Sequence, residues 1–235
     1  MEKYKLTNEK FTTASGKVLY RIQAVREISQ RGRVVKKGTI GGYVESPANL
    51  SQEGEAWLAD KAMSLGKTII EGDAWVGGNA VIWGNSVITD EAEIWGDTFV
   101  ESSTVAGECK IKDQANVKDA TLSGAVILQN KVHVEKTSVE GTVNVMDKSR
   151  IFASTVKGKD IIVREKANID MSNIGGISTY ETPEIVVIGG ESSLFRTRIF
   201  GKNIVITGNA KLGKGALLIG EKILISDHSD IAGNV

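Results

Sequence analysis

The chain lacks the cysteine pairs that stabilise small secreted proteins and the long apolar runs that form membrane-spanning helices. It has one cysteine, Cys109, so no intrachain disulfide can form, which fits a reducing compartment. No run of residues approaches the roughly 20 apolar positions that a membrane-spanning helix needs, and the start lacks a signal core. These absences exclude a disulfide scaffold and a helical membrane protein. We therefore expect a cytoplasmic protein without a membrane partner.

The chain also lacks an excess of either charge, with 29 basic and 29 acidic residues. A balanced charge gives no global field for a polyanion, so we do not expect nucleic-acid binding. The distribution is uneven, because residues 1–37 hold ten lysines and arginines against three glutamates. This segment is either a charged, solvated face or a basic arm for an anionic ligand.

Glycine is abundant, with 26 residues, and much of it belongs to a short repeat. Residues 72–101 repeat every six residues, with a small residue followed two places later by an aliphatic one. The small residues stand at positions 74, 80, 86, 92 and 98. A fixed short period of this kind indicates a solenoid, because each repeat is one structural unit that stacks on the next.

A longer period lies beyond residue 110, where similar segments place Leu122, Val139, Val156 and Ile174 at nearly equal spacings. Each spacing equals three six-residue repeats or falls one residue short of that, so each turn of the solenoid has three sides. Alternation sends the small and the aliphatic side chain inward, and Gly, Asn and Asp turn the corners. The predicted fold is all-β, a three-sided, single-stranded parallel β-helix of about ten turns.

Two regions depart from the repeat. Residues 1–43 lack it and alternate like strands, with a turn signal at residues 15–16, so we predict an N-terminal β-rich cap that contains a hairpin. The β-helix then occupies residues 44–235, with a shift of phase that places Cys109 rather than Lys110 inward. Residues 177–184 interrupt the pattern, and we predict a loop inserted at a corner.

The repeat resembles that of the hexapeptide-repeat superfamily, whose members form left-handed parallel β-helices. The resemblance covers residues 48–235. Runs such as 81–86, 20–24, 41–46 and 49–51 look closest to the YdcK-like proteins of bacteria and phages. The usual repeat has glycine directly after the aliphatic residue, but three glycines of this chain come two places after it: Gly78, Gly84 and Gly96. The period alone leaves a right-handed, bactofilin-type helix open.

The resemblance implies an acyltransferase as one reading of the function. Such enzymes use a histidine as general base toward an acyl-CoA at a subunit interface. The two histidines of this chain, His133 and His228, are the catalytic candidates, each with an ordinary surface or corner role as the alternative. The superfamily's zinc enzymes use three histidines, which one chain cannot supply, so we expect no metal.

Aromatic residues supply the candidate binding positions. Trp57 and Trp75 stand three repeats apart along the chain, so we expect them to stack one turn apart and to face outward. Trp83 and Trp95 fall near corners, and Tyr180 lies in the predicted loop. Exposed aromatic residues often anchor interfaces, although stacking that protects the solenoid is an equal alternative.

The favoured interpretation is a non-catalytic interaction or assembly scaffold of bacterial or phage origin, without a cofactor. We expect a homo-oligomer and allow for another protein partner, because the ends of a β-helix expose unpaired backbone and apolar core. The alternatives are an acyltransferase that uses acetyl-CoA or another acyl-CoA, and a protein that binds a small molecule or an anion through the basic cap.

Overall fold

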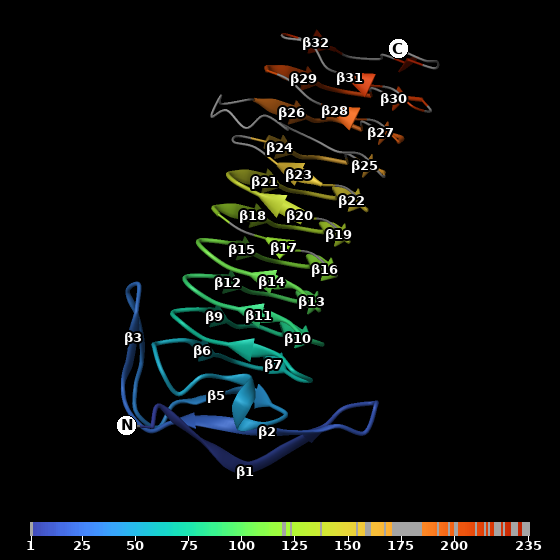
Figure 1. Ribbon diagram of the computed structural model, residues 1–235. Coiled ribbons are helices and arrows are strands. Elements are labelled where there is room, and N and C mark those ends of the chain that lie inside the picture. Colours follow the sequence, from blue (N-terminus) through green and yellow to red (C-terminus); the bar gives the residue numbers. More distant parts are fainter. Residues whose placement is uncertain are drawn as a thin grey trace. The chain divides into compact units, whose positions relative to one another are not determined.

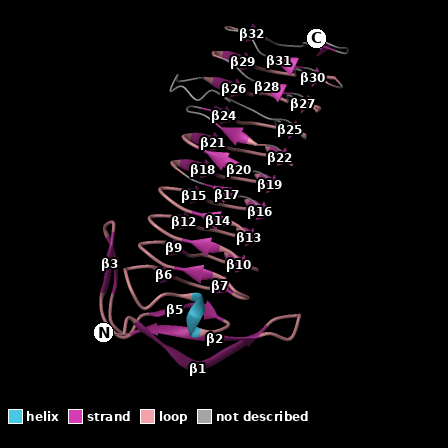
Figure 2. Ribbon diagram, in the orientation of Figure 1, coloured by secondary structure: helices cyan, strands magenta, loops and turns pink. Residues whose placement is uncertain are grey.

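The structure is a computed structural model, and among the residues that it describes the fold is all-β with one 3-10 turn (Figure 2). Internal contacts divide the chain into two compact units, residues 1–113 and residues 114–235. The described residues are 2–118, 121–122, 124–136, 138–153, 155–157, 161–166, 168–170, 185–191, 193–196, 198–199, 202–209, 211–213, 215, 217–218, 222, 224–226 and 230–231.

The first unit is a set of short strands that stack turn upon turn above an N-terminal hairpin (Figure 1). Its elements are β1 (Tyr4–Thr12), β2 (Val18–Ala24), β3 (Ile28–Gln30), β4 (Arg33–Val35), β5 (Ile40–Val44), η1 (Pro47–Asn49), β6 (Trp57–Leu58), β7 (Met63–Ser64), β8 (Ile69–Ile70), β9 (Trp75–Val76), β10 (Val81–Trp83), β11 (Val87–Ile88), β12 (Glu93–Ile94), β13 (Phe99–Glu101), β14 (Thr104–Val105) and β15 (Lys110–Ile111).

The second unit is built of equally short strands. They are β16 (Asn116–Lys118), β17 (Thr121–Leu122), β18 (Val126–Leu128), β19 (His133–Glu135), β20 (Ser138–Glu140), β21 (Val143–Val145), β22 (Arg150–Phe152), β23 (Val156–Lys157), β24 (Ile161–Val163), β25 (Asn168–Ile169), β26 (Val186–Ile188), β27 (Ser193–Leu194), β28 (Arg198–Ile199), β29 (Ile204–Ile206), β30 (Lys211–Leu212), β31 (Leu217–Leu218), β32 (Leu224–Ile225) and β33 (Asp230–Ile231).

Three parallel sheets form the sides of the first unit. In strand order, the first sheet contains β5-β7-β10-β13, the second β8-β11-β14 and the third β6-β9-β12-β15. Val81 pairs with Phe99 on the next turn, a full three repeats later, whereas Glu93 pairs with Lys110, one residue short of that step. The shortened turn confirms the predicted shift of phase, since Cys109 is fully buried.

The repeat folds this way because alternate positions of each short strand point to opposite faces. Ala74, Val76, Ala80 and Ile82 are fully buried, so the small and aliphatic positions fill the core as predicted. The corners need left-handed backbone, and Gly78 shows why glycine serves there. It has a φ of 70°, and a Cβ at this position would lie 2.8 Å from the backbone nitrogen of Gly96.

An antiparallel hairpin precedes the parallel turns. β1 pairs with β2, which pairs with β5, and β5 continues in parallel with β7. Phe11 stands opposite Leu19, so the predicted hairpin is confirmed. Tyr4 fixes β1 to the first turn, because its hydroxyl donates to the carbonyl of Leu50 at 2.7 Å and its ring is 1% exposed.

The second unit repeats the three-sided plan. Its first sheet runs β16-β19-β22-β25-β27-β30-β33 and its third sheet β18-β21-β24-β26-β29-β32, while β17-β20-β23 and β28-β31 form shorter sheets. Val126 pairs with Val143, a step one residue shorter than the step from Val186 to Ile204. Both step lengths expected from the sequence therefore occur. The prediction of an all-β, parallel β-solenoid is confirmed.

One turn of the second unit is longer than the turn that follows it. Ile161 pairs with Val186, whereas Val186 pairs with Ile204, so the first of these two steps takes in more of the chain. The extra residues fall between β25 and β26. The loop predicted at residues 177–184 belongs to this stretch but lies outside the described residues.

Candidate functional site

Trp57 and Trp75 are covered by the N-terminal segment, so the expectation that they are exposed is wrong. They pair in register on the third sheet of the first unit, as predicted, but are only 1% and 9% exposed. The guanidinium of Arg33 lies 5.0 Å from the centre of the Trp75 ring. A Cβ at Gly41 would lie 2.7 Å from the Trp57 ring, which shows how closely β5 approaches that indole.

The cover over Trp75 is the β3–β4 hairpin, which stands beside the stacked turns of this unit (Figure 1). Its inner residues Ile28, Gln30 and Val35 are at most 5% exposed, whereas Val34 between them is 55% exposed. The Gln30 amide donates to the carbonyl of Asp73. The hairpin is therefore an amphipathic arm whose apolar side closes over the outer face of the third sheet.

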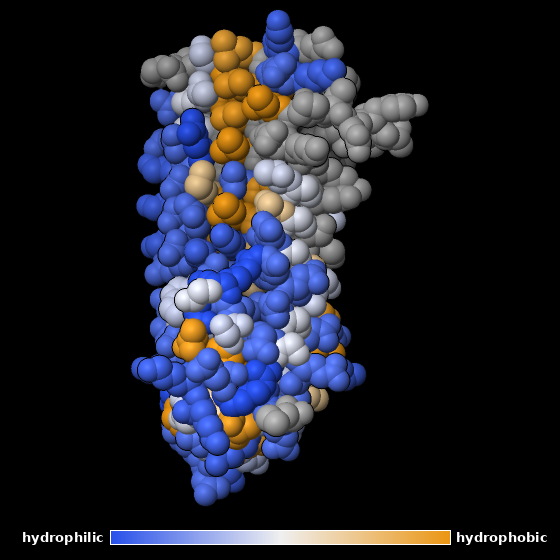
Figure 3. Space-filling model, turned by 90° about the vertical axis from the view of Figure 1, so that its left-hand side faces the viewer, coloured by the Kyte–Doolittle hydropathy of each residue, from blue (hydrophilic) through white to orange (hydrophobic). Residues whose placement is uncertain are grey.

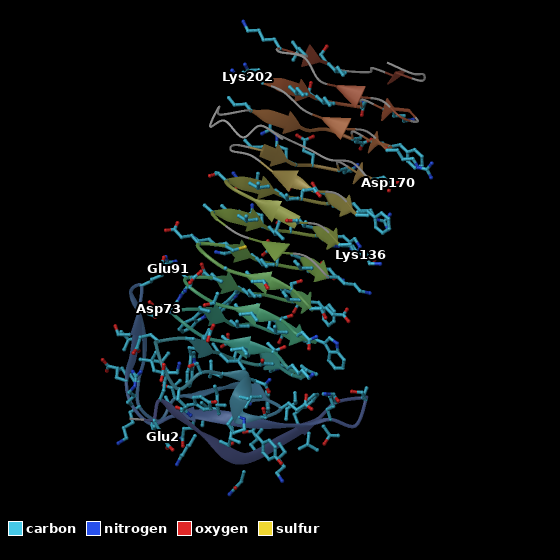
Figure 4. All side chains as sticks on the ribbon, in the orientation of Figure 1. Glu2, Asp73, Glu91, Lys136, Asp170 and Lys202 are labelled. Carbon is cyan, nitrogen blue, oxygen red and sulfur yellow. The ribbon has the colours of Figure 1, made fainter. Side chains whose placement is uncertain are left out.

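Ion pairs hold this arm at its rim. Arg26 binds both carboxylate oxygens of Glu55, at 2.8 and 3.0 Å. Beyond it, Arg31 pairs with Glu91 and Arg33 pairs with Glu93. Figure 4 labels Asp73 and Glu91 on the side of the first unit where the hairpin stands.

Charges on the parallel turns thus neutralise much of the basic N-terminal segment. The Arg26 side chain holds the pKa of the Glu55 carboxyl below its usual value through their hydrogen bonds. In the same segment Lys17 binds Glu45 at 2.8 Å, and Arg21 binds Glu9 at 3.0 Å. Five of the ten lysines and arginines of residues 1–37 therefore have carboxylate partners, which reduces the basic surface left for an anionic ligand.

Trp83 and Trp95 are more accessible. The ammonium of Lys17 lies 5.2 Å from the Trp83 ring, a distance typical of a cation–π contact. Trp95 is 40% exposed and lies over Gly77, where a Cβ would come within 2.3 Å of the ring. Gly77 is therefore a glycine because an indole from the next turn occupies the space of its side chain.

Half-exposed apolar side chains align on the first sheet of the first unit. Tyr43, Met63, Val81 and Phe99 pair in register on consecutive turns, and we call this set the aromatic ladder. The ring of Phe11 lies 5.9 Å from that of Tyr43 and extends the ladder onto the hairpin. The sequence analysis did not predict this set, although each of its residues directly precedes a buried position of its turn.

A second apolar set stands on the outer face of the third sheet in the second unit. Ile162, Val187, Val205 and Leu224 pair in register on consecutive turns, and we call them the aliphatic ladder. The first three are half-exposed and Leu224 is 71% exposed. Figure 3 shows the corresponding hydrophobic band. Sequence reasoning missed it, because an aliphatic residue between two others looks like core.

His133 begins β19 on the first sheet of the second unit, with its side chain 37% exposed. Its Nε2 lies 3.5 Å from Oε2 of Glu135, two residues along the same strand. Asn116 and Arg150 flank it on the neighbouring turns. A carboxylate at this distance can orient an imidazole, so the pair has the elements of a general base, which acts once a substrate comes within hydrogen-bond reach.

The other candidates from the sequence cannot be placed. His228 and Tyr180 lie outside the described residues. In the described part of the chain, no group of three or more His, Cys, Asp or Glu residues could hold a metal ion.

Lys3 and Cys109 are two of the buried titratable groups of the first unit. Lys3 is fully buried, donates to the carbonyl of Glu53 at 3.2 Å, and has its pKa lowered to about 8 by burial. Burial raises the pKa of the Cys109 thiol to about 12, so this cysteine stays protonated and unreactive in the folded protein. Both side chains are therefore packed inside the fold.

The sequence matches no protein-family model and no curated protein. No helix in the part of the chain that the structure describes is long and apolar enough to span a membrane.

Proposed function

We propose that this protein is a non-catalytic β-solenoid scaffold that assembles with other copies of itself. The observation that carries the proposal is the aliphatic ladder, in which exposed apolar side chains stand in register on four consecutive turns. Single apolar residues are common on protein surfaces, but contiguous apolar patches mark interaction sites. The aromatic ladder of the first unit supplies a further surface of the same kind.

We further propose a left-handed coil of about ten turns and a place in the YdcK-like branch of the hexapeptide-repeat superfamily, with a bacterial or phage origin and a cytoplasmic location. The repeat period and the quoted sequence runs support this part of the proposal. A crystal structure would test the handedness and the number of turns directly, because it shows the hand of the coil and allows the turns to be counted.

Sedimentation equilibrium of the purified full chain over a wide range of concentrations tests the scaffold. We expect the average mass to rise above that of the 25.2 kDa monomer as the concentration increases. A mass that stays at the monomer value up to millimolar concentration, with no partner recovered by cross-linking, would contradict the proposal.

The His133–Glu135 pair favours a second candidate, an acyltransferase with His133 as the base. His133 would remove the proton from an acceptor hydroxyl or amine that attacks the thioester of acetyl-CoA or another acyl-CoA. The carbon–sulfur bond then breaks, the acyl group stays on the acceptor, and coenzyme A leaves as the thiol once it takes up a proton. Acetyl-CoA should then raise the melting temperature, and transfer to an acceptor should be lost in His133→Ala. If no acyl donor shifts the melting temperature, this candidate fails.

A further inference from the structure

Gly189 is a glycine that its own fold does not require. It directly follows β26 and still belongs to the ladder of backbone hydrogen bonds, because its N–H donates to the carbonyl of Ile206 at 2.8 Å. Its backbone lies outside the left-handed region, and a Cβ would meet nothing closer than the Arg164 side chain at 3.7 Å. Glycine weakens a strand, and a glycine there often marks a bulge, a tight bend, or a place that a ligand or another backbone approaches closely.

Gly189 lies beside the aliphatic ladder. Along the chain, Ile185, Val187 and Gly189 alternate, so they share the outer face of the third sheet in the second unit. Ile185 is 44% exposed, whereas the backbone of Gly189 is buried and has the Arg164 side chain as its nearest cover. This one turn therefore carries a protruding side chain on one side of the ladder and a missing side chain on the other side.

A protruding side chain on one side of the ladder and a missing side chain on the other side are complementary when a two-fold axis relates two copies. If the axis runs along the ladder, the strands of the second copy point the opposite way. The residue two positions before Val187 in one copy then faces the residue two positions after Val187 in the other copy. Ile185 of one copy thus lies over Gly189 of its partner, on the aliphatic stem of Arg164. Each ladder residue meets its own counterpart.

We propose that the aliphatic ladder is the dimerisation face of this protein, and that the second units of two copies pack side by side with their turns running in the same direction. The inference rests on the proposed scaffold function and names its contact. Two identical ladders have the same spacing of about 4.8 Å per turn, so they match along their whole length. No charged residue stands within the ladder, which is what a desolvated interface core requires.

The size of the face sets the strength of the contact. Four turns at about 4.8 Å span roughly 15 Å between the first and last strands, which is short for the roughly 800 Å² that each partner buries in a stable complex. We therefore expect a weak dimer whose population depends on concentration. Asn144, which pairs with Ile162 one turn earlier, ends the apolar run and limits the face.

Disulfide cross-linking of Val205→Cys tests the pairing. A two-fold axis along the ladder brings residue 205 of both copies together, so mild oxidation should convert most of this variant to a covalent dimer. The natural chain should not cross-link, because Cys109 is fully buried. The matched control is Val34→Cys, an exposed site on the hairpin of the first unit, which should stay monomeric on a non-reducing gel.

Gly189→Leu tests the gap without disturbing the ladder. The Cβ of the added side chain meets only ordinary contacts within its own chain, so we expect little change in the melting temperature, but the rest of the leucine extends toward the position of Ile185 of the partner subunit. We expect the dissociation constant to rise at least tenfold in sedimentation equilibrium. Gly189→Ala should have a smaller effect in the same direction.

The outcomes separate this inference from the scaffold function. A chain that is monomeric at every concentration contradicts both. A chain that self-associates but does not cross-link through Val205→Cys, or whose mass is unchanged by Gly189→Leu, keeps the scaffold and overturns the proposed face. A trimeric mass overturns the two-fold pairing. A ladder that binds lipid vesicles while the protein remains monomeric also overturns it.

Discussion

Trp57 and Trp75 stand on the outer face of the third sheet in the first unit, and the aliphatic ladder stands on the outer face of the third sheet in the second unit. The chain covers the first pair with its own N-terminal segment, whereas the described residues leave Leu224 exposed and the other three residues of the ladder partly exposed. A solenoid buries its inward side chains by stacking, but its outer faces need a separate solution. One solution is intramolecular, and the dimer proposed above would supply the other.

The largest effect is expected from breaking the intramolecular cover. Ile28→Asp places an unpaired carboxylate at a fully buried position of the hairpin. We expect a loss of about 3–5 kcal/mol, or the local opening of the arm if that costs less. Trp57 and Trp75 would then be exposed to water, and the maximum of the tryptophan fluorescence would shift to longer wavelength.

Val34→Asp is the matched control, since Val34 lies on the outer side of the same hairpin and is 55% exposed. A surface change of this kind should stay within about 0.5 kcal/mol. If Ile28→Asp neither loses stability nor shifts the tryptophan fluorescence relative to Val34→Asp, the hairpin does not cover the indoles in solution.

Two glycines sharpen the comparison. At Gly41 an added Cβ would lie 2.5 Å from the carbonyl oxygen of Leu58 and 2.7 Å from the Trp57 ring, whereas at Gly189 the nearest atom is 3.7 Å away. We expect Gly41→Ala to cost about 1–3 kcal/mol and Gly189→Ala to leave stability within about 0.5 kcal/mol. Urea denaturation of both variants checks this, and equal losses would mean that Gly189 is required by its own fold.

Lys3 gives the cap a pH dependence of its own. Its pKa in the folded protein is about 8, below the ordinary value of 10.5. Between these values the unfolded chain binds a proton that the folded chain does not, so stability from this group rises with pH. Below about pH 8 the ammonium is charged in both states, and its full desolvation cost opposes folding.

The Lys3→Met variant isolates this contribution from other groups that titrate at alkaline pH. Relative to Lys3→Met, the natural chain should gain about 1–3 kcal/mol between pH 7.5 and pH 10. Urea denaturation of both chains at several pH values measures the difference. Parallel pH profiles would show that Lys3 is solvated in the folded protein.

A smaller effect is expected at the rim of the hairpin. Arg33 is 40% exposed by its side chain, while its partner Glu93 is 12% exposed and Trp75 lies beneath the guanidinium. A double-mutant cycle of Arg33→Met and Glu93→Gln should give a coupling of about 0.5–1 kcal/mol that weakens with added salt. A coupling of zero at low salt would show that this ion pair does not help to hold the arm.

The repeat predicted the solenoid well, because its period of six fixes which side chains point inward whatever surrounds them. The same reasoning located Cys109 in the core and placed Trp57 and Trp75 one turn apart. It failed on their exposure, because the hairpin that covers Trp75 is a charged segment with very short strands. Its docking depends on partners that lie far along the chain, such as Glu93 for Arg33.

The candidate surfaces were harder to predict for a related reason. Val187 and Val205 lie between aliphatic neighbours, so the sequence alone does not separate core from surface there. The register between turns separates them, because it shows that the middle residues align on one outer face. His133 was found from its residue type, but Glu135 became its partner only once the strand fixed both side chains on the same side.

The most direct test of the central claim compares the masses of Val205→Asp and Val34→Asp by sedimentation velocity at equal concentration. Both variants add one carboxylate to an exposed valine, but only the first changes the aliphatic ladder. We predict that Val205→Asp sediments as a monomer at concentrations where the natural chain and Val34→Asp sediment as dimers. Identical sedimentation of all three proteins would contradict the claim that the ladder joins two copies.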